Sequence, residues 1–108
     1  PAADDNGTAA VALIEIGQAL LTDRPKRSVI LAWVTGEEQG MNGSHYFINN
    51  CPVSPEKISA CLDMDMLGRN NPDSLFLVAS DLLSTELDGA IKKANKNPAL
   101  NFGFDYRY

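Results

Sequence analysis

Histidine, cysteine and long hydrophobic runs are all scarce in this chain of 108 residues. The two cysteines, Cys51 and Cys61, are too few for a disulfide framework and too widely spaced for a structural thiolate zinc site. The longest apolar runs, such as residues 29–34, are far shorter than the roughly 20 residues of a membrane-spanning helix. The sequence therefore predicts no transmembrane segment, and cysteine usage leaves the redox compartment open.

Basic residues are also in deficit, with nine against fourteen acidic residues and a net charge of -5. This balance argues against the electrostatic footprint of a nucleic-acid-binding protein. The basic cluster of Arg24, Lys26 and Arg27 flanks a proline and is explained by a surface turn. The composition predicts one globular domain or part of one. Because the chain opens on Pro1 without an initiating Met or a signal peptide, we expect an excised or processed piece.

Hydrophobic periodicity predicts a chain in which helices and strands alternate. Apolar residues recur at three- and four-residue steps over residues 7–21, which is typical of a helix with one buried face. Residues 28–34 are continuously apolar and rich in β-branched side chains, which indicates a central strand covered on both faces. The further expected elements are a short helix over 39–50, strands over 58–67 and 75–78, and a helix over 82–95, with the tail from residue 101 undecided. This order predicts an α/β layered fold.

Acidic residues follow two of the predicted strands. Glu37 and Glu38 come after residues 28–34, and Asp65 closes the second strand, at the sheet edge where α/β folds place ligands. Taken alone, the glutamates also suit the first turn of a helix, and Asp65 also suits a turn. Together they indicate a metal site, because one glutamate can bind the ion while its neighbour accepts a proton from water. Zinc, manganese and magnesium all suit such carboxylates.

Structural roles explain other conspicuous residues. The polar run Asp4-Asp5-Asn6 precedes a helix, and its side-chain oxygens suit an N-cap as well as a metal ligand. Trp33 and Phe76 lie in apolar segments and are expected in the core. Cys51 and Cys61 are compatible with either one disulfide or two free thiols.

Five motifs, taken in order, carry a family resemblance: ADDNGT at 3–8, RPKRS at 24–28, TGEEQG at 35–40, GSHYF at 43–47 and LDMDMLGR at 62–69. As a set they resemble the co-catalytic zinc aminopeptidases of peptidase clan MH, although each fragment alone is weak. The resemblance implies a three-layer α/β/α sandwich with a mixed, mainly parallel sheet that is incomplete in this chain. Residues 1–108 would then be the central part of a single zinc-peptidase catalytic domain.

The resemblance also implies the roles of individual residues. Asp5 bridges two zinc ions, Glu38 binds one of them and Asp65 binds the other. Glu37 is the general base that takes a proton from the metal-bound water and returns it to the leaving amine. The peptide bond after Asp5 is expected to be cis, Asp4 to support its loop, and Asp63 to orient neighbouring groups. The implied reaction is removal of N-terminal residues from peptides, outside the cytoplasm.

The chain departs from the family pattern in its histidines. The family uses two histidine ligands, and neither is present, while His45 falls at a variable position and is expected on a helix surface. We therefore expect weakened metal binding, no independent activity, and self-association through sheet edges that missing flanks would cover. Two alternatives with the same fold are a non-catalytic receptor-like domain that binds proteins and a single-zinc glutaminyl cyclase-like acyltransferase. Retention of Glu37 and the three ligand carboxylates favours the peptidase.

Overall fold

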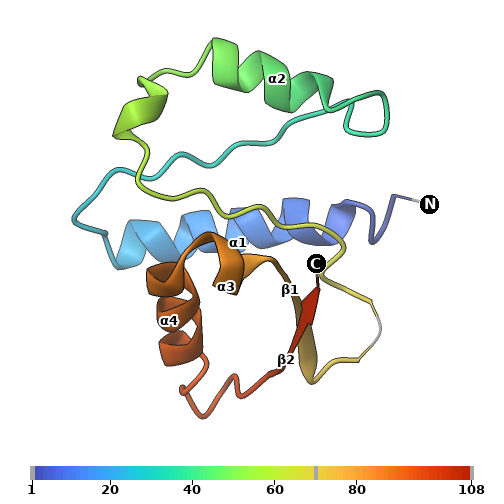
Figure 1. Ribbon diagram of the computed structural model, residues 1–108, viewed down its shortest axis with the longest axis vertical. Coiled ribbons are helices and arrows are strands. Elements are labelled where there is room, and N and C mark those ends of the chain that lie inside the picture. The colour runs from blue at the N-terminus through green and yellow to red at the C-terminus, as the bar shows by residue number, and fades with distance from the viewer. Residues whose placement is uncertain (1, 70, 108) are drawn as a thin grey trace. The chain divides into compact units, whose positions relative to one another are not determined.

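The computed structural model describes residues 2–69 and 71–107, with helices and two strands joined by long irregular segments (Figure 1). The chain divides into two units, Pro1–Met66 and Leu67–Tyr108, which are described separately. The elements in chain order are α1 (Gly7–Thr22), α2 (Asn42–Asn49), the 3-10 helix η1 (Pro55–Lys57), β1 (Ser74–Val78), α3 (Ser80–Leu83), α4 (Thr85–Ala94) and β2 (Gly103–Arg107).

Helix α1 is the principal element of the first unit and matches the sequence prediction closely. A tight turn precedes it, in which the Gly7 N–H donates to the Ala2 carbonyl at 3.1 Å. A Cβ atom at position 7 would lie 2.6 Å from that carbonyl oxygen, so only glycine allows this approach. The helix ends before Pro25, whose ring would clash with a continuing helix.

The two long apolar segments of this unit are not strands, which corrects the prediction for residues 28–34 and 58–67. Both run as plain traces without strand arrows (Figure 1). Side chains tie them into the unit: the Trp33 indole donates to the Ala10 carbonyl at 3.1 Å, and Arg27 donates to the Ser59 hydroxyl at 2.6 Å. Strand formation requires a ladder of backbone partners, and none forms along these segments within the described residues.

Apolar side chains on these segments are consequently open to solvent. Trp33 is 54% exposed, Val29 is 51% exposed and Leu62 is 66% exposed. Phe76, in the second unit, is 47% exposed, so the core positions predicted for Trp33 and Phe76 are wrong. A strand becomes buried on both faces only when sheet neighbours and helices cover it. Ala9 is the single buried apolar residue in the described part of the chain.

The second unit is built on a parallel pair, β1 and β2, in register from Ser74 opposite Gly103 to Val78 opposite Arg107. Parallel strands need a crossover, which α3 and α4 provide (Figure 1). The single helix predicted over residues 82–95 is in fact two, because Ser84 adopts an extended conformation. Its hydroxyl accepts the Leu87 N–H at 3.1 Å and so caps α4.

A polar cluster joins the helix to the sheet in this unit. The Tyr106 hydroxyl on β2 donates to Asp88 Oδ1 on α4 at 2.7 Å, and Lys92 Nζ lies 2.7 Å from Asp88 Oδ2. The crossover between parallel strands confirms the α/β class of the sequence prediction. Among the described residues, no helix combines the length and apolar character needed to cross a membrane.

Candidate active site

Asp5 lies in the turn of residues 3–6 immediately before α1, and its side chain is exposed. The Asp5–Asn6 peptide bond is cis, as the family resemblance implies. Asp4 holds the turn to the helix, because the Thr8 hydroxyl donates to the Asp4 carbonyl at 2.8 Å and lies 3.3 Å from its carboxylate. This contact confirms the supporting role expected for Asp4.

Asn6 occupies the N-cap position of α1, yet its side chain does not cap the helix. The amide instead donates to the Met64 carbonyl at 3.0 Å, and its oxygen lies 3.4 Å from the Met66 N–H. The Asp5 turn is therefore joined to the segment that carries Asp65, although 58 residues separate Asn6 from Met64. The sequence offered no signal for this contact, since Asn at an N-cap has a sufficient local explanation.

Glu37 and Glu38 lie on a compact turn before α2. The Glu37 carbonyl accepts the N–H groups of Gly40 at 2.9 Å and Met41 at 2.8 Å. Backbone bonds thus close the turn, and both carboxylates remain exposed. Helix α2 begins only at Asn42, so the alternative that placed the glutamates in its first turn is wrong.

A close backbone approach fixes the position of this turn. The Gly43 N–H donates to the Thr35 carbonyl at 2.7 Å, and the Asn42 N–H donates to the Gly36 carbonyl at 3.0 Å. A Cβ atom at position 43 would overlap the Thr35 backbone. Gly36 itself has φ +72°, in the left-handed region that glycine adopts without strain. Glycines therefore permit the reversal that presents Glu37 and Glu38.

Asp65 lies on the extended segment after η1. Asp63 and Asp65 are exposed whereas Met64 and Met66 are half-buried, the alternation typical of an extended chain. Met66 has φ 49°, an uncommon conformation for a residue other than glycine. The segment thus turns sharply directly after Asp65.

The four carboxylates predicted to act in the site are all exposed, and none of them is bonded to another described residue. Asp5, Glu37, Glu38 and Asp65 make no side-chain hydrogen bond or ion pair with a described residue. The Asn6 side chain links the turn of Asp5 to the segment of Asp65, through its contacts with the backbone of residues 64 and 66. No hydrogen bond between described residues connects the turn of Glu37 and Glu38 to the Asp5 turn or to the Asp65 segment.

Carboxylate oxygens are ligands that zinc accepts, so the donor type fits this metal. Within residues 2–69 and 71–107, however, no three His, Cys, Asp or Glu side chains gather into a group that could hold an ion. His45 is exposed on α2, as expected of a helix-surface residue, and Cys51 and Cys61 are free thiols. Asp5, Glu38 and Asp65 thus stay predicted ligands.

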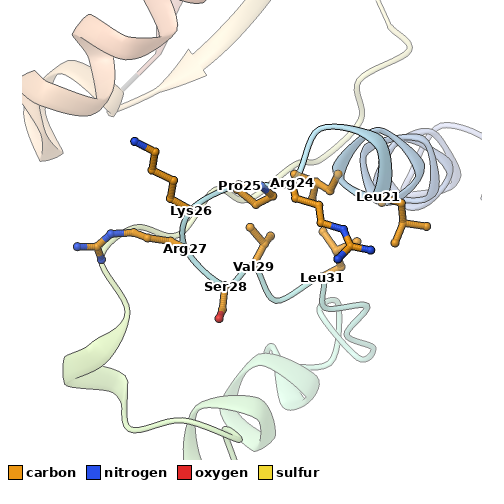
Figure 2. Close-up of a pocket in the computed structure, with 10 residues that line it drawn as sticks. Leu21, Arg24, Pro25, Lys26, Arg27, Ser28, Val29 and Leu31 are labelled. Atoms are coloured by element: carbon orange, nitrogen blue, oxygen red, sulfur yellow. The ribbon is translucent and has the colours of Figure 1, made fainter.

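A pocket of about 450 Å³ lies at the end of α1 and along the segment that follows it (Figure 2). Leu21, Val29 and Leu31 contribute apolar surface, while Lys26 points away from the pocket and Arg27 extends toward Ser59. None of the predicted site residues lines this pocket. It is therefore separate from the candidate active site.

Comparisons with known proteins agree with the motif pattern. Leupeptin-inactivating enzyme 1 of Streptomyces exfoliatus is 36% identical over 72 residues, which cover 64% of this chain and 16% of that protein. An aminopeptidase of Pseudomonas aeruginosa is 39% identical over 72 residues, covering 66% of this chain and 13% of its own length. A protein of Leptosphaeria maculans named as a zinc metalloprotease is 32% identical over 73 residues, covering 68% of this chain and 17% of its own length.

The chain thus spans well under a fifth of the length of these relatives. No solved structure gives a significant match. The model of peptidase family M28, in contrast, matches residues 1–107, almost the whole chain. The chain belongs to peptidase family M28.

Proposed function

We propose that the full-length protein is a zinc-dependent aminopeptidase that removes N-terminal residues from peptides. The family match over residues 1–107 is the observation that carries this proposal. The names of the relatives support it, since they include an aminopeptidase and a zinc metalloprotease. In this proposal residues 1–108 form the central part of one catalytic domain with a three-layer α/β/α sandwich, and alone are inactive.

The proposed ligands are Asp5, shared by two zinc ions, with Glu38 on one ion and Asp65 on the other. Zinc, when bound, would polarise the scissile carbonyl and make a coordinated water more acidic. Glu37 is exposed, so its carboxylate is accessible to water, and the bonds from Gly40 and Met41 to its carbonyl close the turn that carries it. Its carboxylate takes a proton from the attacking water and passes it to the departing amine.

The direct test uses the full-length protein with amino-acid anilides that have either a free or an acetylated N-terminus. We expect cleavage of the free substrate alone, loss of cleavage after chelation, and recovery on addition of zinc. Cleavage that survives complete metal removal would contradict a metallopeptidase. Zinc-loaded protein that cleaves neither substrate would favour a non-catalytic member of the same fold.

Two further parts of the proposal concern location and association. We propose that the protein acts outside the cytoplasm, as the resemblance implies, which fractionation of the producing cells would test. We also propose that residues 1–108 in isolation self-associate, because Trp33 and Leu62 leave extended apolar segments exposed. Sedimentation of this isolated piece at increasing concentration would show an increasing mass.

A further inference from the structure

The side chain of Asn6 makes a contact that its helix-capping position does not explain. Asn is among the preferred N-cap residues because its oxygen accepts an N–H group of the first helical turn. At α1 no such bond forms. The amide instead reaches the backbone of residues 64 and 66, which flank Asp65 on either side.

The two contacts of Asn6 have the geometry of one step in a strand ladder. In an extended segment the carbonyl of residue 64 and the N–H of residue 66 point to the same side, so one amide can serve both. The amide nitrogen donates to the Met64 carbonyl at 3.0 Å, and the amide oxygen lies 3.4 Å from the Met66 nitrogen. Asn6 therefore stands where a backbone partner would be, since no other described residue bonds the Met64 carbonyl or the Met66 N–H.

Two observations indicate that this contact governs how Asp65 is presented. Met64 and Met66 are half-buried while Asp65 between them is exposed, so the register at residue 64 decides which side chains face solvent. Met66 also adopts a left-handed φ of 49°, a conformation that needs support from its surroundings. The bond from its N–H to Asn6 gives such support.

We propose that Asn6 is a positioning residue that sets the spacing between Asp5 and Asp65. Asp5 is the preceding residue on the same turn, so an amide fixed to residues 64 and 66 fixes both carboxylate-bearing segments to each other. This inference rests on the proposed function, in which Asp5 and Asp65 hold zinc. Groups that orient metal ligands typically change metal affinity 10- to 100-fold when they are removed.

The test compares Asn6→Ser with Asn50→Ser in the full-length protein. Serine is also a preferred N-cap residue, so the first substitution preserves the start of α1 while it removes the amide. Asn50 is a matched control, since it is exposed and its amide donates to the Tyr46 carbonyl at 2.9 Å on the same unit. Hydrogen exchange at Met66 in metal-free protein, zinc Kd, kcat and the thermal midpoint are measured for each variant.

For Asn6→Ser we expect faster exchange at Met66, a zinc Kd raised by about 10- to 100-fold, and an almost unchanged thermal midpoint. Excess zinc should recover much of the lost kcat. Asn50→Ser should match the wild type in all four. Equal zinc Kd and Met66 exchange in the two variants, with active wild type, would overturn the positioning role and leave the proposed function intact. A wild type that neither binds zinc nor cleaves would overturn both.

Discussion

Asp65 in the first unit and Asp88 in the second are held in opposite ways. Asp65 is exposed, and its carboxylate makes no hydrogen bond or ion pair with a described side chain. Asp88 is only 7% exposed and accepts the Tyr106 hydroxyl at 2.7 Å, with Lys92 Nζ also at 2.7 Å. A buried carboxylate must be paired to remain charged, whereas one that is to bind a metal or a proton has to stay available.

The pKa values of Asp88 and its two partners reflect this pairing. The hydrogen bond from Lys92, and then that from Tyr106, holds the pKa of the Asp88 carboxyl below its ordinary value. The same contacts with Asp88 raise the pKa of Lys92 and the pKa of Tyr106. Lys92 Nζ also lies 5.4 Å from the centre of the Tyr106 ring. The charge of Asp88 is thus neutralised locally, and this pairing stabilises the attachment of α4 to β2.

The sharpest way to break this comparison is Glu37→Gln in the full-length protein. Removing a general base typically lowers kcat by 10²- to 10⁴-fold, and we expect about 10³-fold here. Zinc content should not change, because Glu37 is not a proposed ligand. Glu15→Gln, an exposed position on α1, is the control and should retain wild-type kcat. Near-normal activity of the Glu37 variant would exclude Glu37 as the base.

A smaller effect is expected from Gly43→Ala. The added methyl would overlap the Thr35 backbone and force apart the turn that presents Glu37 and Glu38. Overpacking of this kind costs about 1–3 kcal/mol, so the free energy of unfolding should fall by that amount and kcat should fall with it. Gly89→Ala is the control, because nothing lies within 4 Å of a Cβ atom at that position. Denaturant unfolding and steady-state kinetics would check both variants.

Tyr106→Phe should affect stability alone. It removes the hydroxyl that donates to Asp88 and retains the ring, so the thermal midpoint should fall by a few degrees. Because this cluster contains none of the proposed site residues, zinc content and kcat should stay at wild-type levels. A large loss of zinc from this variant would contradict the division of roles between Asp88 and Asp65.

The smallest expected effect is a change of stability with pH. Because the folded pKa of Asp88 is lowered from 3.8, its contribution is complete above that value and is lost as the pH falls through the folded pKa. The folded pKa values of Lys92 and Tyr106 are raised, so their contributions to stability are complete below pH 10. These contributions are lost as the pH rises through the folded pKa values. The difference in thermal midpoint between wild type and Lys92→Met should shrink at both extremes. A difference that stays constant across pH would count against this pairing.

Local sequence patterns predicted the elements whose stabilising contacts are local. The helices α1 and α2 follow from neighbouring residues. The strand predicted over residues 75–78 is also present, although its ladder partner β2 lies far along the chain. Residues 28–34 have the composition of a buried strand, but sheet pairing depends on partners far along the chain, which composition does not specify. Ser84 is a preferred N-cap residue, and that signal could have revealed the break between α3 and α4.

In the candidate site, too, local motifs were predictable from the sequence and long-range contacts were not. The motifs located Glu37, Glu38 and Asp65 beyond apolar segments, and the structure places all three on exposed turns or extended chain. The long-range contact of Asn6 with Met64 could not be predicted, because its side chain had an adequate local role as a helix cap. Whether the carboxylates converge depends on contacts of this kind rather than on any local pattern.

The most direct measurement is the zinc stoichiometry of the full-length protein with Asp65→Asn or Asp63→Asn. The two residues are exposed on the same segment, so the substitutions remove equal charge from almost the same place. Ligation by Asp65 predicts that its variant lacks about one zinc ion per chain even in excess zinc, while Asp63→Asn, which removes an orienting group but no ligand, reaches the wild-type value in excess zinc. Equal zinc content in both variants and the wild type would contradict the proposed ligand set.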